Sequence, residues 1–200
     1  SAIPIGAKGR VMGHYKANLR DIEFNLFEVF DRQALLGSAP YDDFDEATAR
    51  EMLKHVKELA EGDLAESFVD GDRNPPKYDP VTQEITMPAS FKKSYKAFQD
   101  SGFWNVQLQH ELGGTPCPPS LKWAINEMIL GANPAIAMFG ATYSFAELLY
   151  TLGTLEQKKL AKWIVEKGWL CTMVLTEPDA GSDVGAGRTR ATQNEDGTWN

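Results

Sequence analysis

Apolar residues between Lys16 and Gly168 recur at steps of three and four, and this spacing is the feature that most constrains the fold. Such a period places apolar side chains on one face of a helix, and that face must then be buried against other helices. Glycines and prolines interrupt the pattern and divide it into separate segments. The period stops after Gly168. The sequence therefore predicts a helical domain followed by structure of a different kind.

The individual helices are predicted from these apolar faces and from residues that cap or stop a helix. They cover residues 16–36 in part, 46 to about 68, 91–101, 121–130, 134–152 and 155–167. Expected amino-terminal caps are Asp45, Ser90, Ser120 and Asn133, and expected carboxy-terminal stops are Gly102, Gly131 and Gly168. Thr154 and Gln157 have the spacing of a capping box. The helix over 134–152 is apolar on nearly every side and is expected to be buried.

The remaining segments read as loops and strands. Prolines between Asp70 and Pro80 predict an ordered loop, and a short strand is expected at 84–87. Residues 169–176 and 188–193 are strand-like, with a turn at Asn194–Gly197 between the second of them and its return strand. Only three residues follow that turn. We therefore expect a β domain that continues beyond this chain, which makes the chain a fragment of a longer polypeptide.

Composition limits the classes of partner. The net charge of −8 opposes nucleic-acid binding, which needs clustered basic residues. Cys117 and Cys171 are far apart and have no nearby ligand pattern, so neither a disulfide framework nor a metal site is predicted. The sequence shows no uninterrupted apolar run near the roughly 20 residues that cross a bilayer and no secretion signal. We expect a cytoplasmic protein without a membrane partner.

The segment from Leu175 to Gly187 is the candidate ligand-binding site of the sequence. It reads as a strand end followed by a turn that contains three glycines. Glycines allow successive backbone N–H groups to converge on an anion such as a phosphate. The dinucleotide fingerprint is not met, because Gly185-Ala-Gly187 is followed by Arg190 and a strand, and a Walker loop is also absent. A flexible surface hairpin explains the loop composition equally well.

The run Met173-Val-Leu-Thr-Glu-Pro-Asp-Ala-Gly-Ser-Asp183 resembles the signature of acyl-CoA dehydrogenases. The order of the other segments is similar to that family: a helical domain, then Glu111-Leu-Gly-Gly114, then the capping run that begins at Leu152, then a β domain. The residues Tyr15–Asp21 and Gly71–Pro76 further resemble a long bacterial branch with an extended amino terminus. That branch includes enzymes for fatty acyl-CoA and methylthiopropionyl-CoA.

The resemblance implies an FAD-dependent enzyme that desaturates an acyl-CoA thioester between its α and β carbons. A base removes the α-proton while hydride leaves the β-carbon for flavin N5. The implied cofactor-binding residues are Met173, Leu175, Thr176, Gly181 and Ser182. Ser182 is also implied to contact the CoA part of the substrate. Met173 replaces an aromatic residue often found in the family, so its contribution is expected from the backbone.

The same resemblance implies partners and a domain plan. The partners are an acyl-CoA substrate, an electron-transferring flavoprotein as electron acceptor, and further copies of the chain in a homo-oligomer. The fold is α+β: an all-helical amino-terminal domain, then the start of a β-barrel-like middle domain, with a carboxy-terminal helical bundle absent from this chain. We expect residues 1–12 to be an expression remnant or disordered start, 13–88 a helical extension, 89–168 the family's helical domain, and 169–200 the truncated β domain.

Several residues have competing interpretations. Glu177 stands beside the loop and has base chemistry, but the Pro178 turn is expected to aim it away from the substrate. The family's base is a glutamate of the missing helical bundle, so no catalytic residue is predicted here. Small residues between Gly131 and Ala141 suit either a wall of the acyl pocket or close helix packing. Trp123, Trp163 and Trp169 are expected in the core. A flavin oxidase on the same scaffold and a non-catalytic nucleic-acid-binding relative are the alternative functions.

We predict that the 200-residue chain by itself is not an active dehydrogenase, because it lacks the implied base and the later domains. The measurement is acyl-CoA-dependent reduction of an electron-accepting dye by the purified chain with added FAD. Dye reduction well above the protein-free rate contradicts this prediction.

Overall fold

A computed structural model describes residues 13–200 of the chain, so the expectation for residues 1–12 lies outside the described residues. The structure divides into two compact units, one ending at Leu170 and the other spanning Cys171–Asn200. The predicted boundaries at residues 88 and 168 stay predictions. Each unit is described by itself below.

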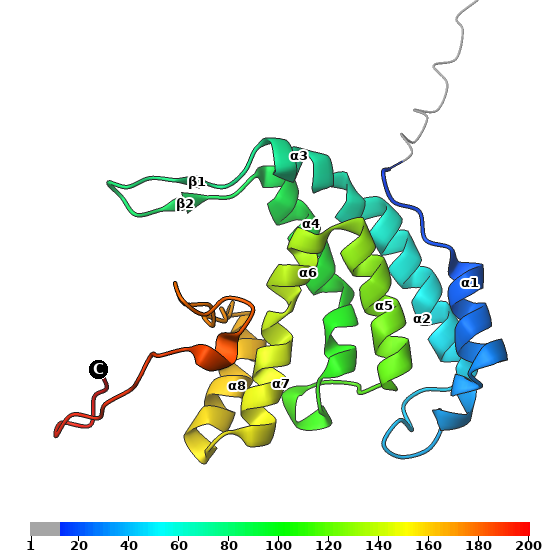
Figure 1. Cartoon of the computed structure of the whole chain (residues 1–200). Coiled ribbons are helices and arrows are strands. Elements are labelled where there is room, and N and C mark those ends of the chain that lie inside the picture. The colour runs from blue at the N-terminus through cyan, green and yellow to red at the C-terminus, as the bar shows by residue number, and fades with distance from the viewer. Residues whose placement is uncertain (1–12) are drawn as a thin grey trace, which may run out of the picture. The chain divides into compact units, whose positions relative to one another are not determined.

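The first unit is built almost entirely of helices (Figure 1). Its α-helices are α1 (Leu19–Glu23), α2 (Glu46–Leu59), α3 (Phe68–Arg73), α4 (Ala89–Ser101), α5 (Pro119–Ala132), α6 (Pro134–Gly140), α7 (Thr142–Leu152) and α8 (Leu155–Lys167). Shorter helical turns are the π-helices η1 (Phe24–Val29) and η3 (Ala60–Leu64) and the 3₁₀-helices η2 (Arg32–Leu35), η4 (Phe103–Gln107) and η5 (His110–Leu112). Helix α5 packs against α2 and η3, and α7 packs along α8. The predicted helical domain is confirmed.

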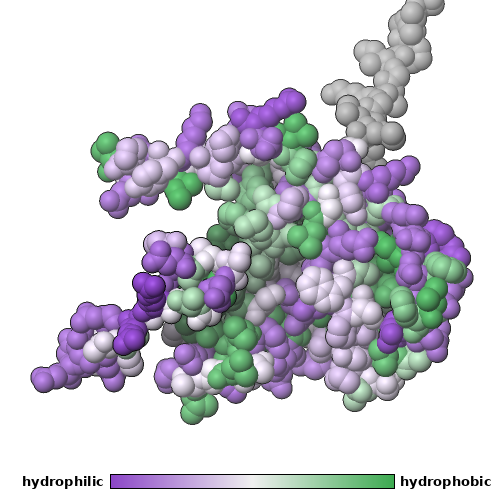
Figure 2. Space-filling model, in the orientation of Figure 1, coloured by the Kyte–Doolittle hydropathy of each residue, from purple (hydrophilic) through white to green (hydrophobic). Residues whose placement is uncertain are grey.

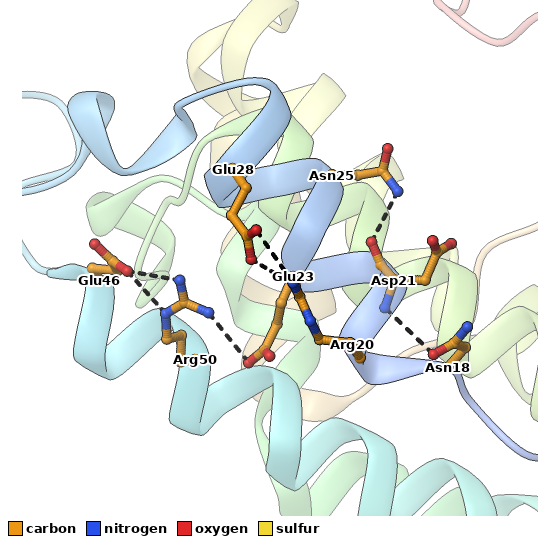
Figure 3. Close-up of polar contacts among 8 residues, drawn as sticks. All are labelled: Asn18, Arg20, Asp21, Glu23, Asn25, Glu28, Glu46 and Arg50. Atoms are coloured by element: carbon orange, nitrogen blue, oxygen red, sulfur yellow. Dashed lines mark hydrogen bonds and ion pairs between the residues drawn. The ribbon is translucent and has the colours of Figure 1, made fainter.

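The amino-terminal helices are joined to α2 through Arg50 (Figure 3). Its guanidinium lies 3.6 Å from the Glu23 carboxylate and 2.8 Å from that of Glu46, and it stacks over the Phe27 ring at 4.2 Å. Asp45 caps α2 as predicted, since its carboxylate accepts the Thr48 amide at 2.7 Å. The partly helical pattern over 16–36 is realised as three short helices of different pitch.

The region after α2 differs from its prediction. The structure continues in helical turns to Arg73, whereas residues 70–80 were predicted as loop. Asp70 and Asn74 bond through their side chains at 2.8 Å, and the first proline stands only at position 75, so nothing prevents this extra turn. Strands β1 (Lys77–Tyr78) and β2 (Ile85–Thr86) then pair antiparallel in a hairpin that projects from α3 and α4 (Figure 1). The strand expected at 84–87 is present in its central part.

Three predicted helix ends are wrong. Ser90 does not cap α4, which starts one residue earlier, because its hydroxyl donates to the Asp70 carboxylate instead. Helix α5 starts at Pro119, whose fixed backbone suits the first turn, rather than after Ser120. Gly131 lies within α5, and Asn133 follows its end. The stops at Gly102 and Gly168, both with positive φ, and the Thr154–Gln157 capping box are confirmed.

Two glycines permit helices and side chains to approach closely. A Cβ on Gly131 would stand 2.5 Å from the Tyr15 ring, and one on Gly140 would stand 2.8 Å from the Phe98 ring. At separations this short, a side chain at either position would force the neighbouring ring to shift. Close packing therefore accounts for part of the small-residue pattern between Gly131 and Ala141.

The segment Pro134–Leu152 is not buried as predicted. It bends at Ala141, between α6 and α7, and much of its apolar surface is exposed, with Met138 and Leu152 each 76% accessible. Apolar surface is visible where α7 turns into α8 (Figure 2). By length and composition alone this segment could cross a membrane, a test that core helices of soluble proteins also pass. Trp123, Trp163 and Trp169 are exposed too, so their expected place in the core is wrong.

The second unit contains turns and isolated bridges but no strand among residues 171–200, so the strands predicted at 169–176 and 188–193 are not formed. Extended segments become strands only when a neighbouring segment accepts and donates their backbone hydrogen bonds. The Asn194–Gly197 turn is present, with the Asn194 backbone amide donating to Thr198 O at 2.8 Å. An isolated bridge joins Gln193 to Trp199. Its 3₁₀-helix η6 spans Val184–Ala186.

Asn133→Ala should lower the free energy of unfolding by about 2–4 kcal/mol, because three buried hydrogen bonds are lost. The Asn133 amide nitrogen donates to Leu64 O at 3.0 Å and to Ser67 Oγ at 3.1 Å, and its oxygen accepts the Ile136 amide at 3.4 Å. Denaturant unfolding followed by circular dichroism measures the change. Asn74→Ala is the control, since its single side-chain bond is exposed. Equal stabilities for both variants contradict the prediction.

Candidate functional site

The five predicted cofactor-binding residues all lie in the second unit and are exposed. They are Met173, Leu175, Thr176, Gly181 and Ser182. Within residues 13–200, the hydroxyls of Thr176 and Ser182 make no side-chain hydrogen bond to another residue. The structure leaves their hydrogen-bonding capacity available and places them on the two sides of the Glu177–Ala180 bridge.

That bridge closes a tight turn at the start of the glycine-containing segment that runs to Gly187. The Glu177 amide donates to Ala180 O at 3.1 Å, and the Ala180 amide donates back to Glu177 O at 3.2 Å. The turn reverses the chain directly after Thr176. The motif residues before and after Pro178 are thereby brought into one short stretch of surface.

The side chain of Glu177 binds the far end of the same loop. Its two carboxylate oxygens accept the backbone amides of Arg188 at 2.8 Å and Thr189 at 3.0 Å. Hydrogen bonds from the Thr189 side chain and from these two amides lower the pKa of Glu177. A carboxylate that is held by amides and made less basic is poorly suited to removing a proton from carbon. Its geometry favours a structural part in the loop.

The backbone between these two contacts fits an anionic group. No intramolecular acceptor is found, among the described residues, for the amides of Gly181, Ser182 and Asp183. Nothing lies within 4 Å of the position that a Gly181 Cβ would occupy, so the backbone is open to an approaching ligand. Unpaired amides beside two free hydroxyls are the donors that the diphosphate and polar edge of a flavin dinucleotide require. The residues present therefore fit the implied cofactor.

The first unit holds a separate apolar cavity of about 280 Å³. Ala137, Gly140 and Ala141 of the small-residue pattern line it, together with aromatic residues of η4 and α5. Gly140 also packs against Phe98, so close packing accounts for part of the pattern, while a role of these residues as a wall of the acyl pocket stays a prediction. The sequence did not mark Phe103, Trp104 or Trp123 as cavity residues, since aromatic side chains at helical spacing usually indicate a core.

No group of three or more His, Cys, Asp and Glu side chains that could hold a metal ion occurs in the described part of the chain. Cys117 and Cys171 are both free thiols. Burial raises the pKa of the Cys117 thiol to about 12, which leaves it protonated and unreactive at neutral pH. Cys171 is only partly covered.

Comparison with known proteins defines the class to which this arrangement belongs. No family model matches the chain. Curated relatives include the butyryl-CoA dehydrogenase of Syntrophomonas wolfei, 30% identical over 88% of this chain and 30% of the relative. The 3-methylmercaptopropionyl-CoA dehydrogenase of Ruegeria pomeroyi is 27% identical over 92% of this chain and 32% of the relative.

A further relative is much more similar. The broad-specificity linear acyl-CoA dehydrogenase of Mycobacterium tuberculosis is 54% identical over 188 residues, which cover 94% of this chain and 31% of the relative. Over nearly its whole length, the chain is similar to acyl-CoA dehydrogenases. It spans about a third of the length of these curated relatives.

The two thiols should react at very different rates. A maleimide at pH 7 is expected to label Cys171 and to spare Cys117 in the native chain, because Cys117 is buried and its pKa is raised. Mass spectrometry of tryptic peptides identifies the labelled thiol, and labelling in denaturant is the control that both can react. Equal labelling of the native thiols, or a disulfide between them, contradicts this prediction.

Proposed function

We propose that the chain is the amino-terminal part of an FAD-dependent acyl-CoA dehydrogenase, which desaturates an acyl-CoA thioester between its α and β carbons. The observation that carries the proposal is the match to acyl-CoA dehydrogenases over nearly the whole chain, combined with an exposed signature loop whose hydroxyls and amides lack partners. FAD, when bound, supplies the acceptor for the hydride that leaves the β-carbon.

The residues of this chain contribute binding and orientation. Thr176 donates its hydroxyl to the flavin, and the backbone of Met173 and Leu175 runs beside it. Gly181 and Ser182 supply amides to the diphosphate, and Ser182 also contacts the CoA part of the substrate. Holding both molecules on one loop fixes the distance between the reacting carbon and the hydride acceptor. Proton removal falls to a glutamate outside this chain.

The surroundings of this loop belong to the same proposal. Residues 169–200 begin a β-barrel-like middle domain, and a helical bundle completes the site. The backbone of Met173–Thr176 makes no ladder in the described residues, which is expected of strands whose partners come from elsewhere. The exposed apolar residues Val174 and Leu175 are then covered on assembly of the barrel. A homo-oligomer, a cytoplasmic location and an electron-transferring flavoprotein as acceptor complete the proposed protein.

The acceptor distinguishes this function from an oxidase on the same scaffold. Reduced flavin that is shielded from solvent passes electrons to a protein partner, whereas flavin open to oxygen reacts with it. Rapid reoxidation of the reduced full-length protein by dissolved oxygen supports the oxidase. The net charge of −8 argues against a nucleic-acid-binding relative.

Thr176→Val in the full-length protein should weaken FAD binding several-fold, because it removes the hydroxyl but keeps the shape of the side chain. A lost hydrogen bond typically costs about 0.5–1.5 kcal/mol, and more where the partner is left buried. Ser182→Ala should weaken both FAD retention and acyl-CoA binding. Flavin titration and the substrate-induced change in flavin absorbance measure the two affinities.

Thr192→Val is the matched control. Its hydroxyl is exposed and makes no hydrogen bond to another described residue, so it should bind FAD as the wild type does. Wild-type affinities for both Thr176→Val and Ser182→Ala mean that the signature loop is not the flavin site. Absence of FAD from the wild-type protein contradicts the proposed function as a whole.

A further inference from the structure

We infer that Glu177 is a positioning residue that clasps the 177–189 loop and so holds the amides of Gly181 and Ser182 ready for a diphosphate-bearing ligand. This inference rests on the proposed function and deepens it. The 177–189 loop is the segment between the two ends that the Glu177 side chain and backbone tie together.

The clasp is built from both parts of Glu177. Its backbone makes the reciprocal bonds to Ala180, which fix the start of the loop, and its carboxylate binds the amides of Arg188 and Thr189, which fix the end. One residue therefore closes a segment eleven to twelve positions long. A second contact spans the same ends, since the Arg188 guanidinium lies 3.7 Å from the Asp179 carboxylate.

The sequence of the loop is adapted to this closure. A Cβ on Gly187 would stand 3.2 Å from Glu177 Oε1 and 3.2 Å from Val184 O, a separation at which a neighbour must shift. Within η6, the amides of Ala186 and Gly187 donate to Asp183 O at 3.1 Å and Val184 O at 3.2 Å. The last four amides of the loop, from Ala186 to Thr189, are thus internally bonded, and the amides from Gly181 to Gly185 are the consecutive run without an acceptor among the described residues.

Charge supports the same assignment. Amides that donate to a carboxylate form stronger hydrogen bonds than amides that donate to a neutral oxygen. The lowered pKa of Glu177 means that this stabilisation is fully present above the ordinary pKa of a glutamate and is lost only as the pH falls through the lowered value. The clasp is therefore closed throughout the neutral range, where a flavoenzyme works.

The test is Glu177→Gln in the full-length protein, with FAD binding measured by quenching of flavin fluorescence. Glutamine keeps the shape but offers one acceptor oxygen in place of two, so one loop amide loses its partner. The FAD Kd should rise about three- to ten-fold. At saturating FAD, kcat should stay within about two-fold of the wild type, because a positioning residue takes no proton. A catalytic base would lose orders of magnitude in kcat instead.

Glu195→Gln is the matched control, since it removes the same charge from an exposed carboxylate that makes no hydrogen bond or ion pair among the described residues. Gly187→Ala is a second variant, which crowds Glu177 Oε1 and should raise the FAD Kd in the same direction. It carries the test if Glu177→Gln does not fold. Unchanged FAD binding in the clasp variants, or an equal change in Glu195→Gln, overturns the inference while the proposed function stands. Wild-type protein that binds no FAD overturns both.

Discussion

The buried amide of Asn133 is the interaction on which the helical unit depends. It joins the end of the α2–η3 segment to the start of α6, because the side chain bonds Leu64, Ser67 and Ile136 at once. Leu64 and Ser67 lie more than sixty positions before Asn133 in the sequence, so the amide fixes a long-range contact whose register apolar packing alone would not set. Gly131 and Gly140 lie on either side of Asn133, in α5 and α6. At both positions a Cβ would force a ring to shift, that of Tyr15 or that of Phe98.

Much of this fold could be predicted from residues that act locally. Asp45 and Thr154 are side chains that commonly cap a helix, and Thr154 is followed at the third position by the glutamine that completes a capping box. Gly102 and Gly168 end their helices in the left-handed backbone conformation that few other residues tolerate. Ser90, like Asp45, is a residue type that often caps a helix and stands just before an apolar face. Its hydroxyl instead donates to the carboxylate of Asp70, twenty positions earlier in the chain. No local pattern reveals such a competitor. The extra turn of α3 was missed for a different reason, because the prolines that begin two residues after Arg73 outweighed a weak helical signal.

The candidate site was predicted from a sequence motif and not from the spacing of apolar residues. A motif supplies the identities of residues but not the contacts that they make. The identities of Thr176 and Ser182 were available from the signature, but the part played by Glu177 was not, because its partners are backbone amides whose positions depend on the turn. The sequence of residues 169–176 by itself could not decide whether they form a strand. A strand is a relation between two segments, and the apolar composition of Val174 and Leu175 says only that a cover is needed.

The exposed apolar surface of α6 and α7 has a consequence for how such a protein is made. In the proposed protein this unit is made first, and a ribosome that adds roughly 5–20 residues per second would need tens of seconds to complete a polypeptide of the relatives' length. During that interval Met138, Leu148 and Leu152 face water on a helical unit whose own core is complete. A holdase chaperone that recognises apolar side chains would find its target there, on folded structure rather than on an unfolded chain. The order of synthesis would then set a period of vulnerability that ends only when the later domains arrive.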